Sequence, residues 1–270
     1  MTGGERSAAR IVGDADPELQ RLAGTRRLLV ALDVDGTLAP FDDDPMRVRL
    51  LPAARRAVTE LAELPDTALA LVSGRTLHDL RVITEHGDDS SWWLAGSHGA
   101  EYWIPGEGEP PRDSDSAKPA RRDALRRRAE ALVESLEGAW IEPKTFGFAL
   151  HTRLADAAAT GSAQRAVDEL MSAEASEWRR RAGHDVIEYA SRAEGKDAAV
   201  RLLRERTGAT AVLFAGDDLT DEDALASLGP DDLGVLVGDR DTHASARVPD
   251  IRALAALLAR LAELRAGRGH

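Results

Sequence analysis

The sequence predicts an α/β fold, in which a smaller α+β segment interrupts the chain of a doubly wound, mostly parallel sheet. Three observations support this prediction. Short apolar runs such as Leu28–Leu32 are typical of strands buried in a parallel sheet. Helical patterns such as Pro52–Leu64 alternate with these runs, as they do in β-α-β units. The alternation stops after Tyr102 and resumes at Lys196–Arg206, which indicates an insertion.

The first part of the chain contains three expected strands and two expected helices. A polar lead-in that ends in part of a helix fills residues 1–24. Pro52 suits the first turn of a helix, where no intrahelical hydrogen bond is lost. In chain order, the elements are the strand Leu28–Leu32, the helix Pro52–Leu64, the strand Ala68–Val72, the helix Thr76–Glu85 and the strand Trp92–Ala95.

The middle part of the chain has a different pattern. Pro105–Pro119 is rich in proline, glycine and acidic residues, which is typical of an exposed linker. Short strand patterns then mix with longer helical ones, which predicts a small α+β domain. The expected elements are the helix Ala120–Leu136, the strands Trp140–Glu142 and Phe146–Thr152 joined by a turn at Pro143-Lys144, the helix Ala163–Ala173 and the strand Asp185–Tyr189.

The last part of the chain returns to the first pattern. Its expected elements are the helix Lys196–Arg206, the strands Val212–Ala215 and Gly234–Val237, and the closing helix Ile251–Leu264. We therefore expect a core formed by residues 1–110 and 191–270, with residues 111–190 as the inserted domain.

Composition excludes several classes of function. The chain has no cysteine, so thiolate catalysis, disulfides and Cys-ligated metals are excluded. A net charge of −12 disfavours nucleic-acid binding, whereas a small phosphorylated ligand stays possible where a metal or local positive charge offsets that field. No apolar run is long enough to span a membrane, and the first 25 residues lack the apolar stretch of a secretory signal. We expect a cytoplasmic monomer.

The strongest local signal is Asp33-Val34-Asp35-Gly36-Thr37, which follows the strand Leu28–Leu32 directly. Ligands of open α/β sheets bind at the carboxyl ends of strands. Two carboxylates there can divide the work, one as nucleophile and one as acid and base. Gly36 permits a sharp turn, and the Thr37 hydroxyl can hydrogen-bond a phosphoryl oxygen. The alternative is a plain turn, since Asp and Gly are turn residues anyway.

A second acidic group, from Asp217 to Asp223, follows the strand Val212–Ala215. Carboxylates crowded at a buried strand end repel one another unless a cation joins them, and oxygen ligands suit Mg²⁺. The alternative is the N-terminus of a helix, whose dipole favours acids. That alternative explains Glu222 and Asp223 better than it explains Asp217.

Two single residues complete the constellation. Ser73 ends the second strand and can donate a hydrogen bond to a phosphoryl oxygen, although Ser-Gly is also a common turn. Lys196 opens a helix, where anions bind readily. The chain has three lysines against thirty-two arginines, which favours a specific role for Lys196 over an ordinary exposed one.

These motifs, in this order, resemble the haloacid dehalogenase-like (HAD) phosphatase superfamily. The matching residues are D-x-D-G-T at Asp33 to Thr37, Ser73, Lys196 and the pair Asp217-Asp218. The resemblance implies a Rossmann-like core, and the inserted block resembles the C2-type cap of this superfamily.

Longer stretches are similar to trehalose-6-phosphate phosphatases, and the resemblance covers about residues 27 to 255. These stretches are LDVDGTLAP, VSGR, AGSHGAE and GDDLTDEDA, with WIEPK and HTR in the insert. The resemblance implies sugar contacts through Glu142, Lys144 and Glu188. It also implies substrate binding by Gly74, Arg75, His98 and Arg153. Departures from the family pattern at Thr152, Asp197 and after Glu188 concern sugar recognition rather than phosphoryl chemistry.

The resemblance implies a mechanism with Mg²⁺ as cofactor. The ion would be held by the carboxylates of Asp33 and Asp217 and the carbonyl of Asp35, with waters steered by Asp218. Asp33 would attack phosphorus, and Asp35 would protonate the leaving oxygen and then activate water. Lys196, Thr37 and Ser73 would stabilise the phosphoryl charge.

Other functions remain open at this point. The chain could act on sucrose phosphate or on a glucosyl- or mannosyl-phosphoglycerate. It could also be a non-catalytic sugar-phosphate sensor, which would have no need of this full set of catalytic residues. A receiver-type phosphoacceptor would explain neither the D-x-D-G-T order nor the insert.

Overall fold

The computed structural model describes residues 10–11, 17–110, 117–144, 146–183, 185–191 and 195–268. The chain divides into two compact units. The first comprises Met1–Pro110 and Glu194–His270, and the second comprises Pro111–Ala193. Most of the expected N-terminal lead-in and the centre of the expected linker, residues 111–116, lie outside the described residues.

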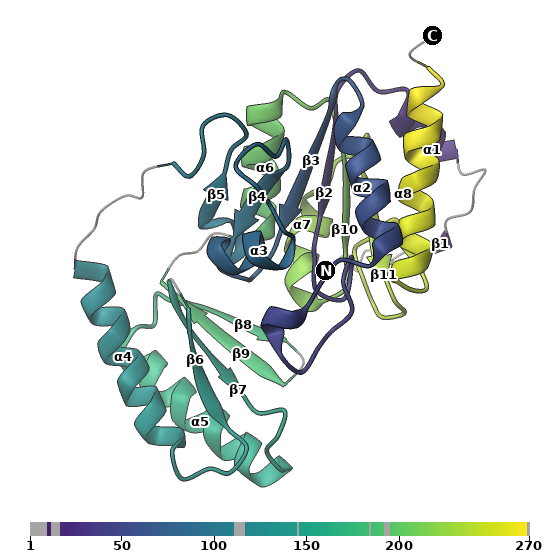
Figure 1. Ribbon diagram of the computed structural model, residues 1–270. Coiled ribbons are helices and arrows are strands. Elements are labelled where there is room, and N and C mark those ends of the chain that lie inside the picture. The colour runs from purple at the N-terminus through teal and green to yellow at the C-terminus, as the bar shows by residue number, and fades with distance from the viewer. Residues whose placement is uncertain are drawn as a thin grey trace, which may run out of the picture. The chain divides into compact units, whose positions relative to one another are not determined.

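An eight-stranded sheet forms the centre of the first unit (Figure 1). Its strand order is β1-β12-β11-β10-β2-β3-β4-β5, and every pairing is parallel except that of β4 with β5. This confirms the predicted mostly parallel α/β sheet. The strands are β1 (Arg10–Ile11), β2 (Leu28–Leu32), β3 (Thr67–Val72), β4 (Trp93–Gly96), β5 (Glu101–Trp103), β10 (Ala211–Gly216), β11 (Leu233–Val237) and β12 (Ala246–Val248).

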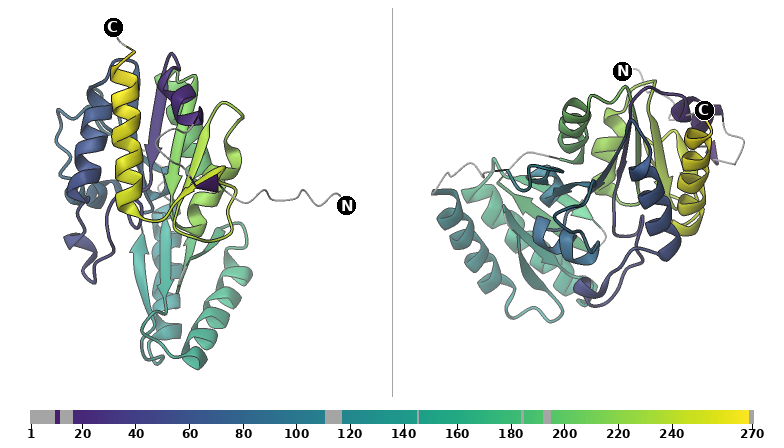
Figure 2. Two further views of the ribbon diagram at one scale, coloured as in Figure 1. Left: turned by 90° about the vertical axis from the view of Figure 1, so that its right-hand side faces the viewer. Right: turned by 45° about the horizontal axis from the view of Figure 1, so that its top comes forward.

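Helices cover both faces of this sheet (Figure 2). One face packs against α1 (Pro17–Ala23), α2 (Pro52–Glu63), α3 (Leu77–Ile83) and α8 (Ile251–Ala266), and the other against α6 (Lys196–Thr207) and α7 (Glu222–Ser227). The sequence of β2 is apolar throughout because both faces of this strand are buried. Leu28, Val30 and Leu32 join the first apolar cluster, whereas Leu29 and Ala31 join the second. A strand buried on both faces leaves no position for a polar side chain.

The second unit is a four-stranded antiparallel sheet in the order β6-β7-β9-β8. The strands are β6 (Trp140–Lys144), β7 (Gly147–His151), β8 (Arg179–Gly183) and β9 (Val186–Ala190). Two helices, α4 (Ala117–Val133) and α5 (Ala157–Glu174), share an apolar cluster with one face of this sheet. Phe148 and Leu150 of β7 lie in that cluster and are fully buried.

Two features of the second unit differ from the sequence prediction. The turn expected at Pro143-Lys144 is strand, because β6 continues through Lys144. Proline is tolerated there because β6 is an edge strand, so its missing N–H need not break a ladder. The strand β8 was not expected, because Arg179-Arg180-Arg181 lacks an apolar pattern. Charged residues of this kind are typical of an edge strand, which β8 is.

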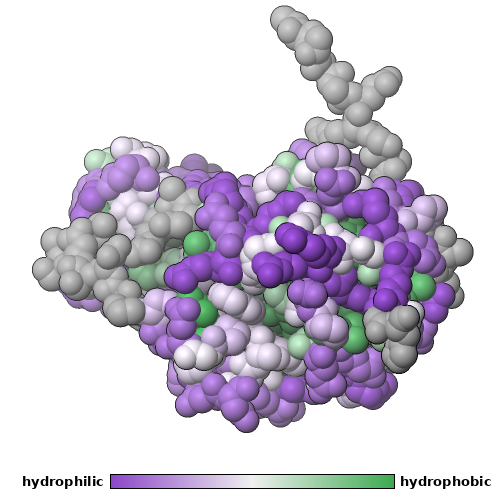
Figure 3. Space-filling view, turned by 90° about the horizontal axis from the view of Figure 1, so that it is seen from above, coloured by the Kyte–Doolittle hydropathy of each residue, from purple (hydrophilic) through white to green (hydrophobic). Residues whose placement is uncertain are grey.

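The surface view in Figure 3 shows a face on which hydrophilic residues predominate. Among the described helices, none is both long enough and apolar enough to cross a membrane.

Candidate active site

Three adjacent strands bring the predicted catalytic residues to one edge of the core sheet. Asp33 follows β2, Ser73 follows β3 and Asp217 follows β10, and the order of these strands in the sheet is β10-β2-β3. Because the three strands are parallel, their carboxyl ends lie on the same side. The predicted constellation is therefore assembled by the sheet itself.

A buried ion cluster lies at this edge. The Lys196 ammonium, on the first residue of α6, donates to Asp33 Oδ1 and to Asp221 Oδ1, each at 2.6 Å. The exposed fraction of these three side chains is 3%, 7% and 0%, in that order. Lys196 is thus the cation shared by two carboxylates in a site that water barely reaches.

Burial sets the acid–base properties of the cluster. Burial raises the pKa of Asp33 well above its usual value, and the positive charge of Lys196 only partly offsets this. Burial also lowers the pKa of Lys196, but the charges of Asp221 and Asp33 outweigh it, so the pKa lies above its ordinary value. Burial and the negative charge of Asp221 raise the pKa of Asp217 to about 6. The site thus concentrates more negative charge than its one lysine neutralises.

The donor set fits a hard divalent cation. One carboxylate oxygen from each of Asp33, Asp217 and Asp221 lies within 4.8 Å of the others. Oxygen-only ligands of this kind suit Mg²⁺. Gly36 is required beside them: its φ is +76°, and a Cβ there would lie 2.1 Å from Asp217 Oδ2. The Thr37 hydroxyl lies 3.1 Å from Asp33 Oδ2 and 3.2 Å from Asp217 Oδ1, so it joins the two acids.

Asp221 is the site residue that the sequence did not single out. Its Oδ2 accepts hydrogen bonds from the backbone N–H groups of Asp217 at 3.1 Å and Asp218 at 3.0 Å, while its Oδ1 binds Lys196. Any Cβ on Gly216 would lie 2.2 Å from the Asp221 carboxyl carbon, so a glycine is needed for this close approach. The only available signals were Gly216 and the four-residue spacing from Asp217, because acids surround Asp221 in the sequence.

Asp218 and Asp35 have different surroundings. The Asp218 carboxylate accepts a hydrogen bond from Leu219 N at 2.7 Å, and it is not one of the three converging acids. Its role toward a metal therefore stays a prediction. Asp35 forms a two-pronged ion pair with Arg75, whose Nε and Nη2 lie 2.7 Å from its two oxygens. Arg75 Nη1 also donates to the Pro45 carbonyl at 2.8 Å, which fixes the guanidinium.

Ser73, Gly74 and His98 lie together at the ends of β3 and β4. Ser73 Oγ accepts a hydrogen bond from Arg75 N at 3.1 Å, and His98 N donates to Ser73 O at 2.9 Å. His98 is buried and has a φ of +57°, which is uncommon for a residue with a side chain. A Cβ on Gly74 would lie 2.7 Å from His98 Nε2, so Gly74 makes room for this ring.

In the second unit, Glu142 is the centre of a separate polar cluster. Its two oxygens bind Lys144 Nζ at 2.8 Å and His151 Nε2 at 2.7 Å. Burial raises the pKa of Glu142, but the hydrogen bonds from His151 and Lys144 outweigh burial and lower this pKa to about 2. The His151 ring stacks on Trp140 with a centroid distance of 4.7 Å. Glu142 is thus an ionised carboxylate with a fixed orientation.

Glu188 and Arg153 are the other predicted sugar contacts. In the strand register, Glu142 pairs with Ala149 and Ala149 with Glu188, so both glutamates point to the same face of the sheet. That face is opposite to the one that packs on α4 and α5, because Phe148 and Leu150 flank Ala149. Arg153 lies just beyond the end of β7 and is exposed.

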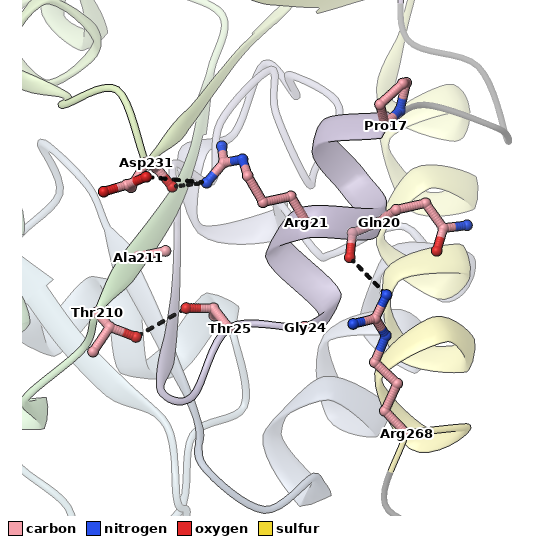
Figure 4. Close-up of a pocket in the computed structure, with 9 residues that line it drawn as sticks. All are labelled: Pro17, Gln20, Arg21, Gly24, Thr25, Thr210, Ala211, Asp231 and Arg268. Carbon is pink, nitrogen blue, oxygen red and sulfur yellow. Dashed lines mark hydrogen bonds and ion pairs between the residues drawn. The ribbon is translucent and has the colours of Figure 1, made fainter.

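A cavity of about 650 Å³ lies at the opposite end of the core strands (Figure 4). Thr210 and Ala211 line it where β10 begins. Several of its polar groups bind one another. The pairs are Thr25 with Thr210, Arg21 with Asp231, and Arg268 with Gln20. It contains none of the predicted catalytic residues.

Comparisons with known proteins identify a family for this chain. A family model described as trehalose-phosphatase matches residues 31–248. A trehalose-phosphate phosphatase of Mycobacterium avium is 34% identical over 238 residues, which is 83% of this chain and 59% of that protein. An uncharacterized glycosyl hydrolase of Mycobacterium tuberculosis is 32% identical over 252 residues, which is 86% of this chain and 18% of that protein. The chain therefore spans less than two thirds of the length of either relative.

Solved structures agree on the fold. The C-terminal domain of trehalose-6-phosphate phosphatase from C. albicans superposes with a TM-score of 0.78 at 23% identity, covering 95% of this chain and 99% of that one. Similarity at this identity establishes the fold.

Proposed function

The chain belongs to the trehalose-phosphatase family, and we propose that it hydrolyses trehalose 6-phosphate to trehalose and inorganic phosphate. The observation that carries this proposal is the buried Asp33–Lys196–Asp221 cluster beside Asp217. A carboxylate held at a strand end beside a cation is suited to attack phosphorus, whereas a purely structural core rarely buries so many acids.

Mg²⁺ is the proposed cofactor. The carboxylates of Asp33 and Asp217 and the backbone carbonyl of Asp35 would hold it, and Asp218 would orient its water ligands. Asp221 is left out of this set because both of its oxygens already accept hydrogen bonds. When bound, the ion supplies positive charge that stabilises the phosphoryl oxygens of the transition state. The excess of negative charge at the site supports this proposal.

The proposed reaction has two steps on Asp33. Its carboxylate attacks phosphorus, and the bond from phosphorus to the sugar oxygen breaks with its electron pair on that oxygen. Asp35 donates a proton to the sugar oxygen, and an aspartyl phosphate remains. Asp35 then takes a proton from water, which attacks phosphorus, releases phosphate and restores Asp33. The two Arg75 contacts hold the Asp35 carboxylate in one orientation, which supports its part as the base in the second step.

The remaining predicted residues bind the substrate. Lys196, Thr37 and Ser73 stabilise the charge on the phosphoryl oxygens. Glu142, Lys144 and Glu188 contact the sugar, since carboxylates accept hydrogen bonds from hydroxyls. The remaining proposed substrate contacts are Gly74, Arg75, His98 and Arg153.

A substrate panel tests this function. Phosphate release from trehalose 6-phosphate should exceed that from glucose 6-phosphate and sucrose 6-phosphate, and it should stop in excess EDTA and return with Mg²⁺. Release from sucrose 6-phosphate alone would keep the chemistry but reject the proposed substrate. No release from any of the three would favour a sugar-phosphate sensor. Cytoplasmic location and a monomeric state are also proposals, which cell fractionation and light scattering would test.

Replacing His151 by alanine should raise the KM for trehalose 6-phosphate up to about tenfold, because a freed Glu142 must be ordered when the sugar binds, at a cost of about 0.5–1.5 kcal/mol. The turnover number should change much less, because His151 orients Glu142 and has no part in the chemistry. Steady-state kinetics on both constants is the measurement.

The matched control is Arg180→Ala in the same unit. Arg180 pairs with Asp168 of α5 and contacts neither Glu142 nor Lys144, so its loss should leave KM unchanged. A His151→Ala enzyme with normal KM and a reduced turnover number would contradict the assigned role.

A further inference from the structure

Arg240, in the loop after β11, contacts the acidic turn that follows β10. Its Nε donates to the Asp217 carbonyl at 2.8 Å, and its Nη2 donates to the Asp218 carbonyl at 2.5 Å. The side chain is about a quarter exposed, at 24%. One guanidinium thus binds two consecutive peptide groups of the turn, which a lysine could not do with the same fixed geometry.

The guanidinium is itself held in place. Its Nη1 lies 2.7 Å from Glu222 Oε1 and donates to the Asp241 carbonyl at 3.0 Å. Glu222 in turn accepts hydrogen bonds from Thr242 Oγ1 at 2.8 Å and from His243 N at 2.7 Å. Arg240 therefore has contacts on all three nitrogens and little freedom to leave the turn.

Asp221 and Arg240 together bind the backbone of Asp217 and Asp218, the first two residues of the acidic turn. The N–H groups of Asp217 and Asp218 bind the Asp221 carboxylate, and their carbonyl groups bind Arg240. All four backbone polar groups of Asp217 and Asp218 thus bind a side chain, and the Asp218 carbonyl also accepts from Asp221 N at 3.1 Å. The position of the Asp217 carboxylate, which converges on Asp33, follows from this backbone.

We propose that Arg240 is a positioning residue for the divalent-cation site. By holding the carbonyls of Asp217 and Asp218, it keeps the Asp217 carboxylate where a cation can bridge it to Asp33. It also places a positive charge behind a group of acids that repel one another. This inference rests on the metal part of the proposed function and not on the identity of the sugar.

The test is isothermal titration of Mg²⁺ alone into the metal-free full chain. Arg240→Ala should weaken Mg²⁺ binding about 10- to 100-fold, the usual loss when a group that orients a metal ligand is removed. Arg240→Lys keeps the charge but loses the fork, so its affinity should lie between those of the wild type and the alanine variant. The thermal midpoint without metal should fall by no more than about 4 °C, because Arg240 is outside the apolar core.

The matched control is Arg260→Ala. Arg260 lies on α8 and pairs with Glu263, so its loss changes net charge equally without touching the turn. Its Mg²⁺ affinity should equal that of the wild type. Equal weakening in this control, or wild-type affinity in Arg240→Ala, would overturn the inference. If Arg240→Ala does not fold, wild-type affinity in Arg240→Lys would overturn it as well. Failure of the wild type to bind Mg²⁺ would instead reject the cofactor proposal, and this inference with it.

Discussion

The Asp33→Asn enzyme is expected to release phosphate from trehalose 6-phosphate about 10⁴-fold more slowly than the wild type, or slower still. An amide cannot act as the nucleophile, and no other described acid is placed to replace it at the end of β2. The free energy of unfolding, in contrast, should not fall. Burial disfavours the charged form of Asp33, so a neutral isostere that still accepts from Lys196 should fold at least as stably.

The measurement pairs turnover with thermal unfolding. Asp250→Asn is the matched control, because Asp250 caps α8 through Ala253 N and asparagine caps helices equally well. That variant should keep both turnover and stability. Asp33→Asn turnover above about 1% of the wild-type value would reject Asp33 as the nucleophile.

The Lys196→Met protein is expected to lose about 3–5 kcal/mol of unfolding free energy, because the buried carboxylates of Asp33 and Asp221 lose their cationic partner. Denaturant unfolding near neutral pH is the measurement. The loss should shrink as the pH falls. Burial already raises the pKa of Asp33, and removal of the Lys196 charge, which lowers it, raises it further. The stability that Asp33 contributes in the variant is therefore fully present only below its unfolded pKa, about 4, and is lost as the pH rises.

Two companion variants make this result specific. Lys196→Met combined with Asp221→Asn should cost less than the two single changes added together, because the residues share one interaction. Lys144→Met should cost less than about 1 kcal/mol, because Lys144 and its partner Glu142 are both partly exposed, at 21% and 41%. Additive losses in the double variant would contradict the assigned ion cluster.

The parts of the fold and site that could be predicted are those with a local signal. The run Leu28–Leu32 is apolar at every position because β2 is buried on both faces, and this pattern identified the strand. Asp33 and Asp217 could be found because each follows such a run. The parallel sheet then brings them together without any further information.

The parts that could not be predicted depend on contacts between distant segments. Asp221 is one acid among several, and only the folded turn shows that it binds Lys196. Arg240 is one of many arginines in a loop, and nothing in its neighbourhood distinguishes it. The edge strand β8 was missed because an edge position removes the need for apolar side chains.

The pairing of β2 with β10 also has a consequence for the nascent chain. Leu28 pairs with Ala211, so β2 leaves the ribosome long before its neighbour on that side exists. At about 5–20 residues per second, the delay is roughly ten to forty seconds. The neighbour β3 and the whole insert, with its own apolar cluster, are made within that time. One edge of β2 stays unpaired until β10 emerges, so the Asp33–Asp217 pair assembles only when β10 joins the sheet, before β11 and β12 extend it.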